Sequence, residues 1–534
     1  MFRPTSPQRK VFGFADMMDE AKRKRLEKHW SEQYRTHALG LIDEQLFAKY
    51  FHPDNGRPNA SIRMVLSVLL LKEMFDLTDQ EALEHLEWNH TWHHAMDITA
   101  DEAHLCQKTL HNHRVLLCSD DEGMALFEQT TARLIRAAGL KTRRQRLDST
   151  HIVSNIKILT RLGLFVQTMT QFLTALRKGH PRLCGRVPAE VLERYLDREG
   201  YFSDVKSSEG QRRLQQVAQD IWCVVRTLGD HRKVRRMPEW ALLERLFHEQ
   251  CQVPEEAEPE EIVFVEKVSS DSLQSPADPD ATYGHKGKGY EAQLAETCEQ
   301  QNPFQVVTAV HLNGANESDQ HQVETVLDQT ERTCGEVPEQ LYADAGYASG
   351  ENIIAARERG TELVAPIGSK ESEKDTLELD LFDFDATGEH VLRCPAGEVP
   401  REHTTTRGGK TRQAWFHKSQ CRSCPHRAQC PVENRKRGPL RRVLSFTPAT
   451  VAVAQRRAEQ QTPAFKERYK IRSGIEATNS ELKRCHGLRK LRVRYKPRVA
   501  LSTRLKALAL NVKRYLKHLV DVSLECEEIV PVAA

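Results

Sequence analysis

Hydrophobic and polar residues follow a helical period near the start of the chain. Residues 59–77 form a strongly apolar stretch, and Thr-Asp-Gln-Glu at 78–81 has the form of a capping box that begins a second helix. Ser-Asp-Asp-Glu at 119–122 has the same form, and the helix that it begins should end at Gly139. The pattern predicts a helical bundle over residues 59–139.

The period changes at residues 145–153, where β-branched residues alternate with polar ones and predict a strand. After this strand the apolar spacing is helical again, which predicts an all-helical insertion. The expected helices of the insertion are 155–178, 188–199, 208–228 and 238–250. An acidic stretch at 254–261 follows and predicts an exposed linker.

Strand and helix patterns then alternate, which is typical of an α/β core with mixed strand directions. Segments 289–297 and 304–312 lie on either side of an Asn-Pro turn and predict a hairpin. The next elements are expected to be a helix at 319–333, a strand at 340–344, a helix at 350–358 and a strand at 362–367. Residues 370–445 break the pattern, and residues 449–520 are helical again.

The 534 residues are too many for one ordinary domain. We therefore divide the chain into an N-terminal helical domain, the first strand of a catalytic core, a helical insertion, the continued core, a small cysteine-rich insertion, C-terminal helices and a tail. The corresponding residues are 1–140, 141–156, 157–255, 256–368, 369–445, 446–520 and 521–534.

The charge of the chain is unevenly distributed, although its net value is only +3. Between residues 466 and 517 there are 17 Lys or Arg residues against three Glu. Such a density suits a polyanion such as DNA. A solvated helix face is an equally good interpretation when charge alone is considered.

Membrane and secretory signals are weak. The longest apolar run, residues 64–71, is far shorter than the roughly 20 residues that span a membrane. The first ten residues lack the apolar core of a signal peptide. We expect a cytoplasmic, nucleoid-associated protein with reduced thiols and no membrane partner.

Two aspartates occupy positions that suit metal-dependent phosphoryl transfer, which needs carboxylate oxygens on rigid elements. Asp148 lies within an apolar strand, where a carboxylate is costly unless it is used. Asp344 ends a strand just before Gly346, at the kind of edge where ligands bind in α/β sheets. For each residue alone, a helix cap or a buried ion pair is an alternative.

A third acidic residue lies in a more specific pattern. Tyr469, Arg472, Glu476 and Lys483 are spaced i, i+3, i+7 and i+14, which places them on one face of a helix. Glu476 can complete a metal site there, while Arg472 and Lys483 can hold phosphates on either side. The alternative is a charged helix face in which Arg472 and Glu476 pair.

These residues resemble the DDE transposases of bacterial insertion sequences, in particular the subgroup marked by Tyr-x2-Arg-x3-Glu-x6-Lys around the third acidic residue. Other segments that are similar to the family lie along most of the chain, about residues 55–520. They are Leu147–Thr150, Asp278–Ala281 with Gly287–Tyr290, Tyr342–Tyr347, His486–Arg489, Asn511–Arg514 and the helical segments 60–77 and 78–88. The helical insertion at 157–255 departs from this pattern.

The resemblance implies a ribonuclease H-like catalytic fold, a mixed sheet flanked by helices, that binds two Mg²⁺ or Mn²⁺ ions. It implies that Asp148, Asp344 and Glu476 are the catalytic metal ligands. The DNA-binding residues that it implies are Tyr469, Arg472, Lys483, Arg484 and Arg489. The substrate would be the terminal inverted repeats of an element, which a homodimer cuts and joins to target DNA, with the N-terminal helical domain gripping the ends.

Four cysteines predict a structural zinc site in the cysteine-rich segment. Cys421 and Cys424 form a CxxC knuckle, and Cys394 and Cys430 supply two more thiolates. His426 is an alternative ligand, and free thiols or a redox CxxC are alternative interpretations. Basic residues around the knuckle suggest that this segment also touches DNA.

Two other functions are compatible with the same residues. A ribonuclease H-fold nuclease or resolvase would cut DNA without joining it, and would give hydrolysis products without strand transfer. An inactive DNA-binding derivative would bind DNA without divalent cations. The complete set of three carboxylates favours the transposase over the inactive derivative.

Overall fold

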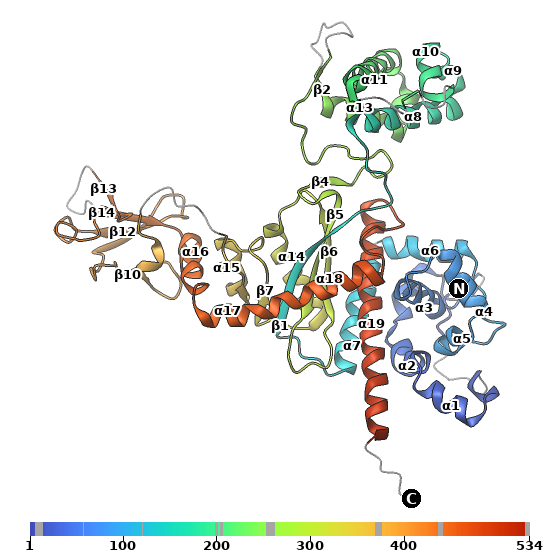
Figure 1. Cartoon of the computed structure of the whole chain (residues 1–534), viewed down its shortest axis with the longest axis horizontal. Helices are drawn as coiled ribbons and strands as arrows, with labels where there is room; N and C mark the ends of the chain where they lie inside the picture. Colours follow the sequence, from blue (N-terminus) through green and yellow to red (C-terminus); the bar gives the residue numbers. More distant parts are fainter. Residues whose placement is uncertain are drawn as a thin grey trace, which may run out of the picture.

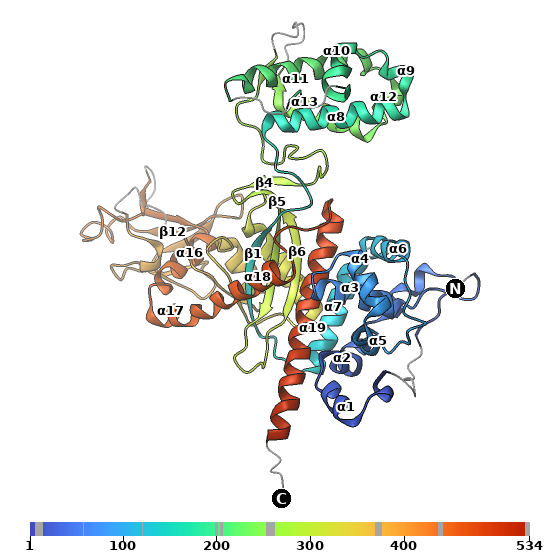
Figure 2. The same ribbon diagram turned by 45° about the vertical axis from the view of Figure 1, so that its right-hand side comes forward.

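The computed structural model describes residues 1–5, 14–56, 58–119, 121–197, 201–202, 207–252, 262–368, 376–435 and 442–528. A central mixed sheet lies between three other groups of elements (Figure 1). The N-terminal helices pack on one side of it, a helical lobe lies beyond one end, and a small β module lies on the other side (Figure 2). The predicted mixed helix-and-sheet class with an N-terminal helical region is confirmed.

The central sheet has six strands among the described residues. Its main order is β6-β5-β1-β7-β8, with β4 also paired to β5. Strand β1 is antiparallel to β5 and parallel to β7, and β7 is parallel to β8. The strands are β1 (Arg144–Ile152), β4 (Thr282–Gly284), β5 (Gly287–Thr297), β6 (Val307–Gly314), β7 (Gln340–Tyr342) and β8 (Glu362–Val364).

The hairpin predicted around residue 302 is confirmed as β5 and β6, which pair antiparallel. The strand predicted at 145–153 is confirmed as β1, and its partner β5 follows the helical lobe in sequence. Strands β5 and β6 are buried along almost their whole lengths because helices cover both faces of the sheet. Two apolar clusters therefore lie on opposite faces.

Helices α14 and α15 cover one face, where Leu147, Ala295 and Ala309 pack against them. The other face, which includes Ile152 and Leu294, packs into a large core with α7 and α19. Neighbouring residues of a strand point to opposite faces. Asp148 therefore leaves the sheet on the side of α18 and α19. These helices are α7 (Glu122–Ala137), α14 (Val323–Cys334), α15 (Gly350–Glu358), α18 (Gly474–Cys485) and α19 (Lys496–Glu528).

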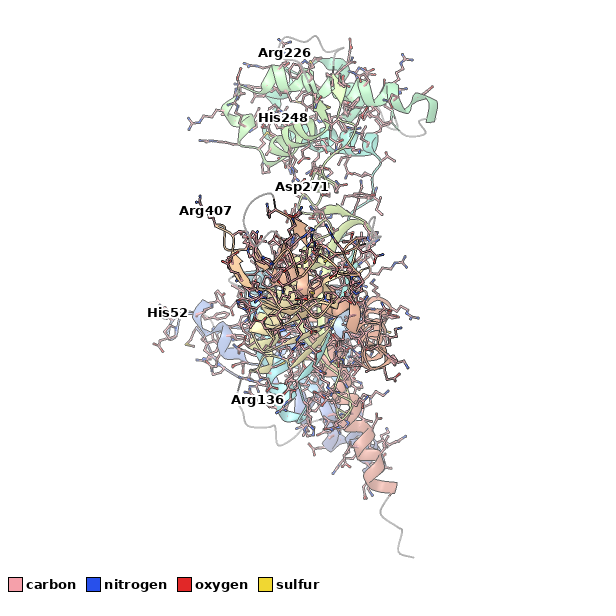
Figure 3. All side chains as sticks on the ribbon, turned by 90° about the vertical axis from the view of Figure 1, so that its left-hand side faces the viewer. His52, Arg136, Arg226, His248, Asp271 and Arg407 are labelled. Carbon is pink, nitrogen blue, oxygen red and sulfur yellow. The ribbon has the colours of Figure 1, made fainter. Side chains whose placement is uncertain are left out.

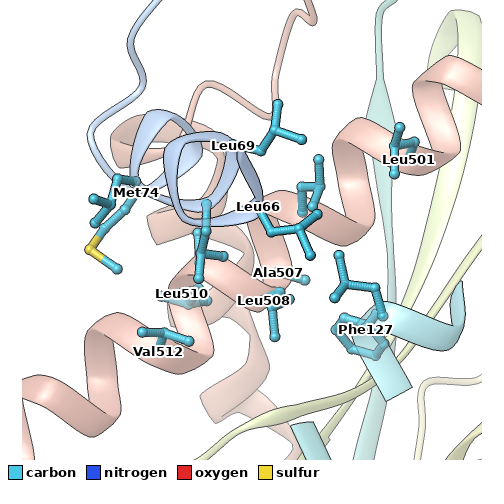
Figure 4. Close-up of a cluster of buried hydrophobic side chains, with 14 of the residues drawn as sticks. Leu66, Leu69, Met74, Phe127, Leu501, Ala507, Leu508, Leu510 and Val512 are labelled. Carbon is cyan, nitrogen blue, oxygen red and sulfur yellow. The ribbon is translucent and has the colours of Figure 1, made fainter. Parts of the chain in front are cut away.

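Helix α19 joins the N-terminal helices to the sheet, since it contacts α3, α7 and β6. Leu66, Leu508 and Phe127 lie together in this core (Figure 4). The other N-terminal helices are α1 (Glu20–Glu27), α2 (Trp30–Gln33), α3 (Ile62–Met74), α4 (Asp79–Trp88), α5 (His90–Met96) and α6 (Gln107–Cys118). Because helices α3 to α7 share one core with the sheet, this region is not an isolated bundle.

The capping box predicted at the start of α4 is confirmed, since Thr78 and Glu81 exchange both hydrogen bonds. The second predicted box was wrong: α7 begins after Asp121, which has a left-handed backbone (φ 55°) and makes no side-chain cap. Residue 120 lies outside the described residues. The predicted end of this helix is confirmed, because Gly139 has a φ of 62° that suits glycine.

The helical lobe has its own apolar core, formed by residues between 164 and 273. Arg226 and His248 lie in this lobe, away from the sheet (Figure 3). Its elements are α8 (Arg161–Gly179), α9 (Pro181–Cys184), α10 (Ala189–Leu192), α11 (Ser207–Leu228), α12 (Arg232–Arg235), α13 (Pro238–Gln250), β2 (Cys251–Gln252) and β3 (Val263–Phe264). The helix predicted from residue 155 starts only at Arg161, after the N-cap Thr160. The predicted acidic linker at 254–261 lies outside the described residues.

The small β module follows β8 and has an antiparallel sheet of order β11-β12-β14-β13 beside the pair β9–β10. Its strands are β9 (Asp383–Phe384), β10 (Val391–Arg393), β11 (Glu402–Thr405), β12 (Arg412–Phe416), β13 (Glu433–Asn434) and β14 (Arg442–Phe446). Helices α16 (Pro448–Glu459) and α17 (Pro463–Tyr469) lead back to the central sheet. Helix α19 continues to Glu528, through residues that the sequence placed in a tail. Over the described parts of the chain, the helices are too short or too polar to cross a membrane.

Candidate active site

Asp148 and Asp344 lie at neighbouring positions on parallel strands. Strand β1 pairs with β7 so that Arg146 lies opposite Tyr342. Continuing this register by two residues places Asp148 beside Asp344, just beyond the end of β7. The strand pairing alone therefore brings the two predicted aspartates together.

Hydrogen bonds hold the segment around Asp344. Its Oδ1 accepts a bond of 2.7 Å from the amide of Gly346. The neighbouring Ala343 donates its amide to Val364 at 3.2 Å and accepts the hydroxyl of Tyr469 at 3.0 Å. Tyr469 thus uses its hydroxyl to hold the backbone next to an acidic residue.

Glu476 lies in the first turn of α18, a helix that contacts β1. The sequence predicted one helix from Tyr469 to Lys483, and this was wrong. The helix α17 ends at Tyr469, a 3₁₀ turn (η9, Lys470–Ser473) follows, and α18 starts at Gly474. At this turn Nη1 of Arg146, in β1, donates to the carbonyl oxygen of Ile471 at 3.2 Å, and Gly474 lies against the same guanidinium group.

Arg472 joins the three acidic residues. Its Nη2 lies 2.7 Å from Oδ1 of Asp148 and 3.6 Å from Oδ2 of Asp344, and its Nη1 lies 3.1 Å from Oε1 of Glu476. The guanidinium side chain is 16% exposed, whereas the three carboxylates are 14%, 38% and 66% exposed in chain order. The acids therefore form a site that is closed at Asp148 and open to solvent at Glu476.

The electrostatics of the site follow from this gradient of burial. Burial raises the pKa of Asp148, Arg472 opposes that shift, and the charge of Asp344 adds to it. Burial also acts to lower the pKa of Arg472, but Asp148 and the other acids raise it overall. The site therefore favours a cation that can neutralise several carboxylates at once.

Two more cationic side chains lie beside Asp148. Burial, together with the charge of Lys286, lowers the pKa of Lys483. Lys286 donates to Oγ of Ser149 at 3.1 Å and pairs with Glu291 at 3.1 Å. Of the other predicted DNA-binding residues, Arg484 bonds Ser480 of its own helix at 2.8 Å, and Arg489 is exposed.

Asn479 and Lys286 are site residues that the sequence did not single out. Asn479 donates to Oδ2 of Asp148 at 2.8 Å. Its position three residues after Glu476, on the same helix face, was a usable signal. For Lys286 the only sequence signal was its place just before the predicted strand at 289–297.

The three carboxylates contact Arg472 rather than each other. Within the described residues, no group of three or more His, Cys, Asp or Glu side chains is close enough to form a metal site. The same holds for the predicted zinc ligands. Those cysteines nevertheless line one small cavity of about 20 Å³ together with His426. They are Cys394, Cys421, Cys424 and Cys430, and they form no disulfides.

Two family models match the chain. The family described as Transposase DDE domain matches residues 393–516, and the family described as Transposase domain (DUF772) matches residues 25–115. No curated protein and no solved structure matches the chain. The first match includes Arg472 and Glu476, whereas Asp148 and Asp344 lie outside both matches. Both matched models describe transposase domains and together indicate an insertion-sequence transposase of the DDE type, a family whose chemistry is DNA cleavage and transfer of the cut strands to new DNA.

Proposed function

We propose that Asp148, Asp344 and Glu476 are the three acids of this transposase reaction, carried on a ribonuclease H-like core. The observation that carries the proposal is their convergence on Arg472 from three separate elements. The sheet order supports the fold assignment, since a hairpin lies beside β1 and parallel strands continue beyond it. We also assign the chain to the subgroup with the Tyr469, Arg472, Glu476 and Lys483 spacing.

The cofactors of this proposal are two Mg²⁺ or Mn²⁺ ions, and the three acids match the oxygen ligands that these ions prefer. Hard divalent cations prefer carboxylate oxygens, which all three acids supply. A side chain at position 346 would fill the space next to Asp344, since a Cβ on Gly346 would lie only 2.9 Å from Oδ1 of Asp344. Glycine at this position leaves that space open. Such ions, when bound, stabilise the attacking and leaving oxygens of an in-line displacement at phosphorus.

The cationic side chains of the site orient the DNA. Arg472, Lys483 and Lys286 lie around Asp148 and would hold phosphate oxygens next to the acids. Arg484 and Arg489 are exposed and extend this basic surface. Tyr469 acts mainly by positioning Asp344, because its hydroxyl donates to the carbonyl oxygen of the preceding residue, Ala343.

Other parts of the chain would bind the DNA farther from the acids. The N-terminal helices and the basic start of α19 share one core, so a DNA end held by one is placed relative to the other. Two element ends must be cut together, so we propose that a homodimer binds the DNA. The location of this complex would be the nucleoid. The family matches support these assignments, because transposases act on DNA.

A structural zinc ion is proposed for the small β module. The four cysteines there face one cavity, and the charges of Cys430, Cys394 and Cys424 each raise the pKa of Cys421, after the larger effect of burial. A shared zinc ion would offset this repulsion by binding the thiolates. The apolar core of the module is small, so a metal ion that cross-links its loops would stabilise the fold of the module.

The test is cleavage and strand transfer with DNA that carries both ends of the element. Asp148→Asn, Asp344→Asn and Glu476→Gln should each abolish Mg²⁺-dependent cleavage while leaving DNA binding measurable by fluorescence anisotropy. Asp328→Asn, on the outer surface of α14, should cleave like the unmodified protein. Retained cleavage in any of the three variants removes that residue from the site. Cleavage without joined products would favour the nuclease alternative.

A further inference from the structure

A fourth carboxylate lies at the same end of the sheet as the three proposed acids. Asp319 begins the 3₁₀ turn η7 (Asp319–Gln322), between β6 and α14. Its Oδ2 accepts the hydroxyl of Ser149 at 3.2 Å, and its Oδ1 accepts the side-chain amide of Gln293 at 2.8 Å. Ser149 directly follows Asp148 in β1, so Asp319 is tied to the strand that carries the first proposed acid.

The residues that hold Asp319 form a connected buried layer. Ser149 and Gln293 lie opposite each other in the pairing of β1 with β5, so their side chains leave the same face of the sheet. Gln293 is fully buried, donates to Asn313 at 3.1 Å and accepts the hydroxyl of Tyr347. The layer therefore fixes the Asp319 carboxylate from two directions.

Tyr347 links Asp344 to the residues that hold Asp319. Its backbone amide donates to the carbonyl oxygen of Asp344 at 3.3 Å, and its hydroxyl donates to Gln293, which in turn donates to Asp319 at 2.8 Å. Asp319 is therefore connected to the loop that carries the second proposed acid as well as to the strand that carries the first.

The space between Asp319 and Asp344 is open because residue 346 is glycine. A Cβ at this position would lie 2.9 Å from Oδ1 of Asp344 and 3.4 Å from Oδ2 of Asp319. Both carboxylates therefore border the same small space. A group with positive charge there would contact both of them.

Protein cations do not neutralise Asp319 directly. In the described part of the chain, no Lys, Arg or His nitrogen lies within 4 Å of its carboxylate, whereas Arg472 pairs with the other three acids. Lys286 reaches Asp319 only through the hydroxyl of Ser149. A partly buried carboxylate beside other carboxylates is unfavourable unless a cation offsets its charge.

From this arrangement we propose that Asp319 supplies a fourth negative charge to the divalent-cation site, beside Asp344. The inference rests on the proposed function of the other acids. Asp148 and Arg472 lie on the α18 side of the sheet, and Asp319 lies on the α14 side. Asp344, beyond the end of its strand, borders both. The fourth charge thus approaches the site from the face opposite Glu476.

The test measures cation binding by the full-length protein rather than its activity alone. Titration with Mn²⁺, followed by electron paramagnetic resonance, gives the Kd of each variant. Asp319→Asn keeps the size of the side chain and removes its charge, and we expect at least a tenfold weaker Kd. Asp319→Glu keeps the charge and should bind Mn²⁺ more tightly than Asp319→Asn. Asp328→Asn, farther along α14, is the matched control and should leave the Kd unchanged.

Thermal unfolding without metal separates charge from folding. Asp319→Asn removes an unneutralised charge, so its Tm should equal or exceed that of the unmodified protein. A Tm that falls together with Mn²⁺ affinity would assign Asp319 a structural role and overturn the inference. An unchanged Kd in Asp319→Asn would also overturn it.

The same titration separates this inference from the proposed function. If Asp148→Asn and Asp344→Asn lose Mn²⁺ binding while Asp319→Asn does not, only the role of Asp319 fails. If none of the three variants changes the Kd, the proposed metal site fails as a whole. In cleavage assays, high Mn²⁺ concentration should restore much of the rate of Asp319→Asn and little of the rate of Asp148→Asn.

Discussion

The guanidinium of Arg472 lies 2.7 Å from the carboxylate of Asp148, although 324 residues separate them in sequence. The same side chain contacts Asp344 and Glu476, so a single cation neutralises three acids. Without it, the three negative charges would repel each other in a partly buried place. Arg472 therefore contributes to the stability of the site as well as to its proposed contact with DNA.

Replacing Arg472 by Ala should lower stability most when no divalent cation is present. Loss of one partner from a buried ion pair costs about 3–5 kcal/mol of unfolding free energy, and we expect the lower end of this range because Asp344 and Glu476 are partly exposed. Added Mg²⁺ should raise the Tm of Arg472→Ala by more than it raises the Tm of the unmodified protein, because it replaces the lost charge. Thermal unfolding with and without Mg²⁺ measures the difference. Equal shifts would contradict this account of Arg472.

Gly289→Ala should destabilise the central sheet strongly. The φ of Gly289 is 143°, and a Cβ there would lie 2.2 Å from the carbonyl oxygen of Ile152 in the neighbouring strand. Backbone atoms cannot move aside cheaply, so we expect a loss of about 2–4 kcal/mol. Gly408→Ala is the control, since no atom lies within 4 Å of a Cβ at that position. Chemical denaturation of both variants tests the expectation, and equal stabilities would refute it.

Glu32 should make the N-terminal helices sensitive to acid. Its carboxylate accepts hydrogen bonds from His94 at 2.5 Å and Thr36 at 2.8 Å. Burial acts to raise the pKa of Glu32, but these bonds and the nearby charges lower it from 4.5 to about 2. A lowered folded pKa means that the added stability is complete above pH 4.5 and is lost as the pH falls towards 2.

The measurement for Glu32 is Tm as a function of pH. The Tm of the unmodified protein should fall more steeply than that of Glu32→Gln between about pH 4.5 and 2. At neutral pH, Glu32→Gln should be the less stable of the two. Glu20→Gln, which removes an exposed pair with Lys24, is the control and should follow the unmodified protein. Parallel curves for Glu32→Gln and the unmodified protein would rule out this role.

Lys483→Ala should weaken DNA binding in a salt-dependent way. If Lys483 contacts one phosphate, its loss should reduce the slope of log Kd against log salt concentration by about 0.9. Arg136→Ala is a matched control, because Arg136 is an exposed cation near the far end of α7 (Figure 3). Anisotropy titrations at several salt concentrations provide the slopes. A slope that does not change in Lys483→Ala would place the phosphates elsewhere.

If the cysteines of the small β module bind zinc, removal of the zinc by a chelator should make the module more sensitive to limited proteolysis. The purified protein should then carry about one zinc ion per chain, measured by elemental mass spectrometry. Cys421→Ser should lose that zinc and expose the module to limited proteolysis. Cys223→Ser, in the helical lobe, should keep it. Zinc-free protein with an unchanged proteolysis pattern after chelation would show that these thiols are structural without a metal.

The sequence pattern predicted helices and strands correctly where contacts between residues close in sequence determine the element. The alternation around Asp148 predicted β1, and the Thr78 and Glu81 pair predicted the start of α4, because both depend on contacts within a few residues. The single helix predicted across Tyr469 and Glu476 was wrong, because a 3₁₀ turn interrupts it where Arg146 of a distant strand bonds the carbonyl oxygen of Ile471. Local spacing carries no information about such a contact.

The sequence by itself determined the types of elements, the basic C-terminal segment and the residues that resemble a transposase, since these depend on composition and short spacing. Only the tertiary structure decided that Arg472 joins three acids and that Asp319 faces the same space from the other side of the sheet. The physical reason is that charge repulsion and burial depend on distances between segments far apart in the chain. Strand pairing and helix packing set those distances.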